Sequence, residues 1–293
     1  MDNYLNSYRE MISLRGLTHH TVTSYSTYIS AYLDYLSVFL CKDPQDVSWQ
    51  ELRDFIRWLQ KARSLSDRTM NAVISQLRFF TIYVLHKTWD DSQLPRRRFD
   101  EYLPYVPSQK DTWTFISTIP DLKVKAFVTL LYSAGLRSCE VRNLKCPDIE
   151  HSNKRIFIRQ AKNRSSRYAI LSDTAWDTIL EYWYSFPAGA RPRDWLFTQQ
   201  RDKTRPLNHE HIPHHIALHE KRLGWEHRIS CHTFRHAFGT HLYENGTDLL
   251  TIKALLGHKS ITSTTIYVHL ASNGTTCAVS PLDRLAGEYR GRV

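Results

Sequence analysis

Several features that identify common protein classes are missing from this chain of 293 residues. Its cysteines are odd in number, widely scattered and nowhere spaced as CxxC: Cys41, Cys139, Cys146, Cys231 and Cys277. This pattern argues against a disulfide framework and against a zinc ribbon. No apolar run approaches the ~18 residues of a membrane span, and the N-terminal MDNYLNSYRE lacks the basic and then apolar order of a secretory signal. We therefore expect a soluble protein of a reducing cytoplasm that does not bind a membrane.

Acidic side chains are in the minority, since 39 Lys and Arg face 29 Asp and Glu, which gives a formal net charge of +10. Each Lys or Arg placed against a phosphate releases a condensed counterion, so the excess favours a polyanionic partner such as nucleic acid. Many basic proteins bind no nucleic acid, so charge alone does not decide the function. Charged residues at 23% and hydrophobic residues at 42% indicate a folded chain, long enough for two domains.

Residues 1–92 show the apolar spacing of helices and are predicted to form one compact four-helix domain, with a short opening helix. Residues 20–36 place apolar side chains three and four apart, on one helix face: Val22, Tyr25, Ile29, Leu33 and Leu36. Ser48 and Glu51 have the spacing of a capping box, which predicts that a helix begins there. A further helix is expected over 66–85.

Residues 93–110 are predicted to be a linker between two domains. Prolines in this segment remove backbone donors and restrict the residues before them: Pro95, Pro104 and Pro107. The segment also contains a run of arginines that could follow a DNA phosphate backbone or could simply be solvated: Arg96, Arg97 and Arg98. The second domain is then expected to occupy residues 111–293.

The second domain is predicted to be α+β. Residues 124–136 have helical spacing, and helices are expected again up to residue 270. Between them, residues 155–160 and 167–171 are predicted to form two strands around a polar tip, which makes a small β-hairpin. The fold class is therefore mainly α, with a small hairpin or sheet in the second domain.

Four spots in the second domain carry residues suited to phosphate chemistry. They are Arg137 and Glu140 after the turn at Gly135, Lys162 at the hairpin tip, His232 with Arg235, and His258 with Tyr267. His232 and Arg235 share one helix face because they are three residues apart. Taken singly, each spot is weak evidence, since an isolated Arg or His in a basic protein is more often structural or solvated.

The segment before the tyrosine is predicted in more detail. Residues 248–256 form an amphipathic pattern that ends at Gly257, the position of a C-terminal cap glycine. This places His258 just beyond the helix end. Ser260 or Thr262 is expected to cap the short helix that carries the tyrosine.

Taken together and in order, these residues resemble the tyrosine recombinase (phage integrase) family, in particular its simple Xer-like bacterial type. The resemblance covers nearly the whole chain and is most specific over residues 230–270, where the motifs H-x-x-R, THL, LLGH and IY-x-HL follow one another. It implies an N-terminal core-binding domain of SAM-like fold and a catalytic domain of the DNA breaking–rejoining type. It also implies site-specific DNA recombination, in integration, excision or resolution, through a 3′-phosphotyrosine intermediate and Holliday-junction strand exchange.

The same resemblance implies the partners and the setting. The substrate would be double-stranded DNA with inverted-repeat core sites, bound by a homotetramer that forms from monomers on the DNA. No metal, ATP or other cofactor is expected. The protein would act in the bacterial cytoplasm at the nucleoid, as the recombinase of a mobile element.

The family's motif gives each candidate residue a role. The assigned roles are Arg137 and Arg235 as phosphate clamps, Lys162 as the general acid for the leaving 5′ oxygen, His232 and His258 as further members of the pocket, Tyr267 as the nucleophile, and Glu140 as a supporting residue. Planar guanidinium groups bind two phosphate oxygens at once. A phenol with a pKa of ~10 needs a cationic pocket, or His232 as a base, to react near neutrality.

At the hairpin the sequence departs from the family pattern. Relatives often have glycine after the lysine, whereas Asn163 follows Lys162 here. Lys154 is a weaker rival for the role of general acid, and Arg164 is close by in the sequence.

The residues leave two other functions open. A type IB topoisomerase-like enzyme would use the same set to relax supercoiled DNA without exchanging partners. A DNA-binding regulator would have lost its catalytic set, but every catalytic candidate of the family motif is present.

A His-rich segment after residue 207 suggests a metal site at first sight: His209, His211, His214, His215 and His219. No cysteine or closely spaced carboxylate pair completes such a site. We therefore expect a solvated or DNA-facing helix there, and no metal.

Overall fold

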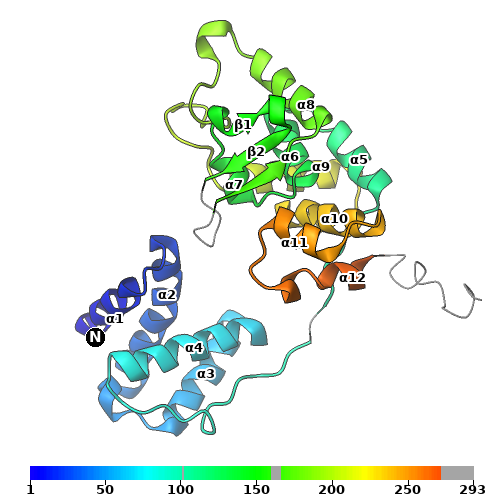
Figure 1. Cartoon of the computed structure of the whole chain (residues 1–293). Helices are drawn as coiled ribbons and strands as arrows, with labels where there is room; N and C mark the ends of the chain where they lie inside the picture. The colour runs from blue at the N-terminus through cyan, green and yellow to red at the C-terminus, as the bar shows by residue number, and fades with distance from the viewer. Residues whose placement is uncertain (101, 160–165, 272–293) are drawn as a thin grey trace, which may run out of the picture. The chain divides into compact units, whose positions relative to one another are not determined.

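The computed structural model describes residues 1–100, 102–159 and 166–271. The chain divides into two compact units, Met1–Glu101 and Tyr102–Val293, and both are mostly helical (Figure 1). Among the residues described, none of the helices has the length and apolar character needed to cross a membrane.

The N-terminal unit is built from α1 (Asp2–Leu14), α2 (His19–Tyr35), α3 (Trp49–Arg63) and α4 (Asp67–Tyr83). Ser48 and Glu51 cap α3 reciprocally, which confirms the predicted capping box. Aromatic rings from α2, α3 and α4 meet in the centre of the unit and are almost completely buried: Tyr32, Phe55 and Phe80. The predicted four-helix unit is therefore confirmed.

The predicted linker is irregular, but its first part is attached to the N-terminal unit. The described residues between 84 and 108 form no helix or strand. Leu94 is buried in the hydrophobic core of the four helices. The backbone of Arg97 exchanges hydrogen bonds of 2.8 and 2.9 Å with the side chain of Asn71, and the Arg97 guanidinium pairs with Asp67 at 2.7 Å. Both partners belong to α4, so this helix fixes the path of the linker.

The second unit contains a three-stranded antiparallel sheet in the order β1 (Ile149–Glu150), β2 (Arg155–Ile158), β3 (Arg167–Ile170). β2 and β3 pair from Arg155 opposite Ile170 to Ile158 opposite Arg167, so the predicted hairpin is confirmed. β1 was not predicted, because a strand of two residues gives no detectable periodicity.

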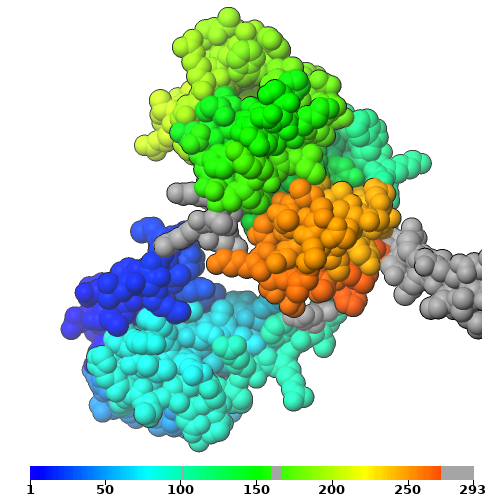
Figure 2. Space-filling model, viewed as in Figure 1, coloured from blue at the N-terminus to red at the C-terminus, as the bar shows by residue number. Residues whose placement is uncertain are grey.

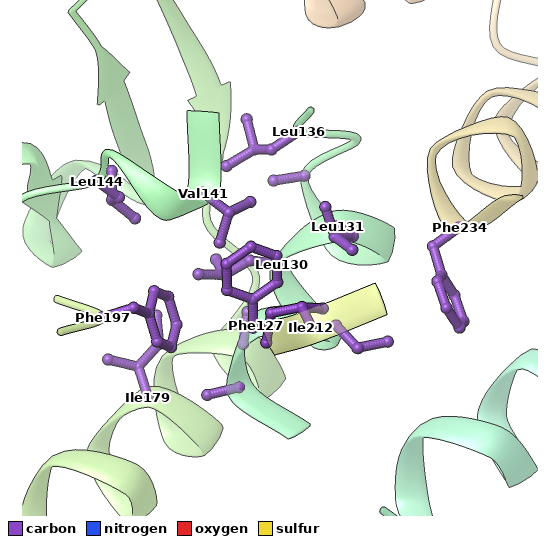
Figure 3. Packing of buried hydrophobic residues seen from close by; sticks show 14 of the residues in the cluster. Phe127, Leu130, Leu131, Leu136, Val141, Leu144, Ile179, Phe197, Ile212 and Phe234 are labelled. Carbon is purple, nitrogen blue, oxygen red and sulfur yellow. The ribbon is translucent and has the colours of Figure 1, made fainter. Parts of the chain in front are cut away.

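The described helices of the second unit are α5 (Gln109–Ser117), α6 (Leu122–Ser133), α7 (Ser138–Arg142), α8 (Asp173–Tyr184), α9 (His211–Leu223), α10 (Cys231–Glu244), α11 (Leu249–Leu256) and α12 (Ile266–Leu270). α6 is central, since it packs against α8 and α10 and its side chains Phe127, Leu130 and Leu131 are at most 1% exposed. Figure 3 shows Phe127 and Leu130 near Ile179 of α8 and Phe197.

α10, α11 and α12 form a smaller cluster, drawn in yellow to orange in Figure 1. Its buried core consists of Phe238 from α10, Ile252 and Leu256 from α11, and Tyr267 from α12. α11 also contacts β3, and Figure 2 shows the orange segment against the green segment that holds the sheet. Four of the residues that the sequence singled out for phosphate chemistry come from this segment, His232, Arg235, His258 and Tyr267, whereas Arg137 and Glu140 lie at the start of α7.

Candidate active site

A buried carboxylate organises the beginning of α7. The Glu140 side chain is 1% exposed and accepts hydrogen bonds from the backbone N–H of Arg137 at 2.9 Å and from its guanidinium at 2.8 Å. The Arg167 guanidinium donates to both carboxylate oxygens, at 2.9 and 2.8 Å. Burial alone would raise the pKa of Glu140, but Arg167 and Arg137 lower it to about 2. Glu140 is therefore ionised at neutral pH and fixes two guanidinium groups.

Arg235 is buried more deeply than either of these arginines, with 3% of its side chain exposed. Its guanidinium donates to the carbonyl oxygens of Gly135 and Leu256, the latter at 2.6 Å, and lies 4.0 Å from Glu140. Burial and the charge of Arg137 lower the pKa of Arg235 to about 10, which leaves it cationic at neutral pH. Three cations thus face one carboxylate, and an anion could neutralise the excess charge of this arginine cluster: Arg137, Arg167 and Arg235.

Arg167 was not among the predicted site residues. It begins β3, and its Nε donates to the carbonyl oxygen of Leu255 in α11 at 3.1 Å. Gly257 ends α11 with φ of 63°, which confirms the predicted cap glycine, and a Cβ at this position would lie 2.8 Å from Cδ of Arg167. The partners of Arg167 are 27 and 88 residues away in the sequence, so no local pattern could have revealed them.

Tyr267 lies in α12 and is 1% exposed. The ring of His258 lies nearly parallel to it, with ring centroids 6.3 Å apart, and Nδ1 of His258 shares a hydrogen bond of 3.0 Å with the hydroxyl of Thr264. Burial raises the pKa of Tyr267, whereas the charges of Arg235 and Arg137 oppose this shift. The arginines therefore favour the phenolate that burial disfavours. Burial and the same two charges lower the pKa of His258 to about 4.

α10 carries two imidazoles one turn apart. His232 is exposed and His236 is half-buried, and their ring centroids are 5.4 Å apart. The ring of His236 also lies 6.1 Å from that of Tyr267. Burial, followed by the effects of His232 and Arg235, lowers the pKa of His236 to about 4. His236 was not predicted as a site residue, although its i+4 spacing from His232 was a signal that could have found it.

The predicted cap of the tyrosine's helix is wrong. The hydroxyl of Ser260 accepts from the backbone N–H of Thr262 and begins a separate 3-10 turn over Ile261–Ser263. α12 begins after Thr265, and among the described residues no side chain caps it. The extra turn separates Ser260 from the helix that it was expected to cap.

Comparison with known proteins settles the family. The Phage integrase family matches residues 111–273, and the Phage integrase N-terminal SAM-like domain matches residues 4–91. Tyrosine recombinase XerD of Listeria monocytogenes is 30% identical over 276 residues, which cover 89% of this chain and 91% of that protein.

The chain belongs to the phage integrase family. A tyrosine recombinase of Pseudothermotoga lettingae is also 27% identical to this recombinase over 292 residues, which cover 96% of this chain and 99% of the relative. The predicted enzyme class, a site-specific tyrosine recombinase of the DNA breaking–rejoining type, is confirmed.

Solved structures share the fold of this recombinase. XerH bound to its palindromic difH substrate has a TM-score of 0.70 at 20% identity, covering 88% of this chain and 79% of that one. A lambda integrase dimer bound to a COC′ core site has a TM-score of 0.70 at 17% identity, covering 91% of this chain and 94% of that one. The predicted fold class is confirmed, with a SAM-like N-terminal domain and a small sheet in the catalytic domain.

The hairpin tip with the predicted general acid, Lys162, and its neighbour Arg164 lies outside the described residues. The rival Lys154 is exposed and pairs with Asp173 at 2.8 Å. Just beyond the end of β2, the guanidinium of Arg159 pairs with the buried carboxylate of Asp148 at 2.6 Å. The recombinase therefore anchors the base of this hairpin by charge.

The three arginines of the linker differ in their surroundings. Arg96 and Arg98 are exposed, whereas Arg97 is half-buried and its guanidinium donates to Gln60 and Asp67. Contact with a DNA backbone stays a prediction for this run, and the ion pair of Arg97 competes with such a contact.

Four histidines of the His-rich segment lie in α9, whereas His209 precedes this helix. The rings of His211 and His215 pack 4.5 Å apart. His219 is buried rather than solvated, and its Nε2 shares hydrogen bonds of 3.1 Å with the hydroxyl of Thr118 and the carbonyl oxygen of Phe115. Across the described ranges, no group of three His, Cys, Asp or Glu residues is close enough to hold a metal ion.

Proposed function

We propose that this recombinase cuts one DNA strand at a time by attack of Tyr267 on a phosphodiester. The attack gives a 3′-phosphotyrosine intermediate, and Holliday-junction strand exchange follows. The observation that carries the proposal is that the ring of Tyr267 packs against α10, the helix of Arg235, whose guanidinium lies with that of Arg137 at the carboxylate of Glu140. The charges of both arginines also oppose the rise of the pKa of Tyr267. A phosphodiester bound by these two arginines would be held beside the phenol.

The arginine cluster suits the charge that develops in this reaction. Negative charge builds on the nonbridging phosphate oxygens, and guanidinium groups already held in place stabilise it without reorganisation. Glu140 supplies that preorganisation for Arg137 and Arg167 through four hydrogen bonds. Arginines thereby take the part that a divalent cation has in other nucleases, which supports a reaction that needs no metal.

The proposed step moves two protons. The bond between Tyr267 Oη and phosphorus forms as the phenol proton passes to His232, and the bond from phosphorus to O5′ breaks as Lys162 protonates the leaving oxygen. His258 would donate a hydrogen bond to a nonbridging oxygen. The phosphotyrosine conserves the energy of the broken ester, so the 5′-hydroxyl of another strand can reverse the step without ATP.

The partner in this proposal is double-stranded DNA with inverted-repeat core sites. The net charge of +10 favours a polyanion, and the XerH and lambda integrase structures with the same fold hold DNA. Four copies, monomeric before binding, would assemble on two sites in the bacterial cytoplasm at the nucleoid, as the recombinase of a mobile element.

A suicide-substrate assay tests the proposal. Nicked duplexes that carry candidate core sites are incubated with the recombinase in EDTA and run on a denaturing protein gel. We expect a slowly migrating covalent complex that disappears in Tyr267→Phe and persists in Tyr184→Phe, because Tyr184 is 60% exposed. Relaxation of supercoiled DNA that has no core site would instead favour a topoisomerase, and tight binding without a covalent complex would favour a DNA-binding regulator.

A further inference from the structure

One glycine lies inside α10, where glycine is unfavourable. Gly239 is buried and has an ordinary helical backbone, so no unusual dihedral angle explains its presence. A glycine in a helix interior lowers stability by about 0.5–1 kcal/mol relative to alanine. The reason for a glycine here must therefore lie in what packs against its Cα atom.

The ring of Tyr267 fills the space that a side chain at Gly239 would need. An ideal Cβ at Gly239 would lie 2.5 Å from Cζ of Tyr267, and 2.6 and 2.8 Å from the two Cε atoms. Carbon atoms in ordinary contact are about 3.5–4.0 Å apart, so an alanine would push the ring away by about 1 Å. These three carbons form the end of the ring that carries the hydroxyl, which is the atom proposed to attack DNA.

Two imidazoles also lie near the same ring. The imidazole of His258 lies parallel to the ring of Tyr267, and the imidazole of His236 lies 6.1 Å away at a tilt of 56°. On α10, Arg235 is four residues before Gly239 and so shares its helix face. Because Gly239 has no side chain, the hydroxyl end of the Tyr267 ring can lie directly against α10, the helix that also carries the proposed phosphate clamp Arg235.

We propose that Gly239 is a positioning residue for Tyr267, an inference that rests on the proposed role of Tyr267 as nucleophile. The missing Cβ lets the ring lie flush on α10 and sets the distance of its hydroxyl from a phosphate held by Arg235 and Arg137. A reacting atom that is misplaced by about 1 Å can lose about 100-fold in rate. Gly239 thus limits the size of the side chain that an active recombinase of this sequence can carry at this position.

Gly239→Ala tests the inference, with Gly189→Ala as the matched control because no atom lies within 4 Å of a Cβ at Gly189. For Gly239→Ala we expect wild-type affinity for core-site DNA and little change in melting temperature, because the gain in helix propensity offsets the lost packing. Single-turnover formation of the covalent complex should slow by about 10–100-fold. Gly239→Ser should behave in the same way, and Gly189→Ala should cleave like the wild type.

A modified substrate separates a defect of the nucleophile from a defect of the leaving group. In a 5′-bridging phosphorothiolate, a sulfur atom replaces O5′ and departs without protonation. Slow cleavage by Gly239→Ala should persist on this substrate if the glycine positions Tyr267. Cleavage at the wild-type rate or faster, or full rescue by the sulfur leaving group, would overturn the inference.

Tyr267→Phe, measured in parallel, separates this inference from the function on which it rests. A covalent complex in Tyr267→Phe would refute the nucleophile assignment and the proposed function with it. Loss of the complex in Tyr267→Phe, together with wild-type cleavage in Gly239→Ala, would refute only the positioning role of Gly239.

Discussion

The carboxylate of Glu140 holds two guanidinium groups, so Glu140→Gln should weaken the fold of the catalytic unit. The amide keeps the shape of the side chain but cannot accept hydrogen bonds on both sides. Removing one partner of a buried ion pair costs about 3–5 kcal/mol, and the side chain of Glu140 is 1% exposed. We therefore expect the free energy of unfolding to fall by about 3–5 kcal/mol. At ~2–4 °C per kcal/mol for a domain of this size, the melting temperature should fall by roughly 6–20 °C.

The pH dependence of stability gives a second check on Glu140. Its pKa is about 2 in the folded protein, against 4.5 for a free side chain. Because the folded pKa is depressed, the carboxylate stabilises the fold above pH 4.5, and this stabilisation is lost as the pH falls toward about 2. The difference in free energy of unfolding between wild type and Glu140→Gln should shrink across that window.

Urea unfolding at pH 7, followed by circular dichroism, measures the loss. Glu181→Gln is the matched control, because Glu181 is 53% exposed and lies 3.6 Å from Lys125. An exposed pair of this kind contributes about 0.2–1 kcal/mol. If Glu140→Gln were as stable as Glu181→Gln, the carboxylate would not be what holds the arginine cluster together.

Three further predictions concern single groups of the site. The pKa values of His236 and His258 are lowered to about 4, so the free energy of unfolding should fall as the pH drops from 6.5 toward 4. In a variant with His236 and His258 both replaced by glutamine, the melting temperature should depend less on pH in that range. Gly257→Ala should lower the free energy of unfolding more than Gly224→Ala, since both have positive φ but only the first would push a Cβ into an arginine; equal losses in urea would contradict this. Arg137→Lys, which loses the planar fork, should slow covalent cleavage by about 100-fold or more and leave gel-shift binding nearly intact, and unchanged cleavage would remove Arg137 from the proposed mechanism.

Local signals in the sequence predicted much of this fold. The capping box at Ser48, the strand pattern on either side of the hairpin and the cap glycine Gly257 depend on neighbouring residues, and the structure confirms all three. The order of Arg137, Glu140, His232, Arg235, His258 and Tyr267 predicted the family, which the comparisons confirm.

What the sequence did not reveal depends on long-range contacts. Arg167 is held by the carboxylate of Glu140 on α7 and the carbonyl oxygen of Leu255 on α11. His219 is held by Phe115 in α5 and by Thr118 just after that helix. Gly239 matters for the proposed site only because the ring of Tyr267, 28 residues later in the chain, packs against it. The wrong cap at Ser260 arose because a spacing rule cannot show that an extra turn intervenes.

The central claim is that Tyr267 becomes covalently linked to a 3′ phosphate of DNA. The most direct measurement is mass spectrometry of the trapped complex after digestion with protease and nuclease. The account predicts one modified peptide, residues 260–270 or a larger fragment that contains them, with a 3′-linked nucleotide on Tyr267. A nucleotide on any other residue, or a 5′ linkage to Tyr267, would contradict the account.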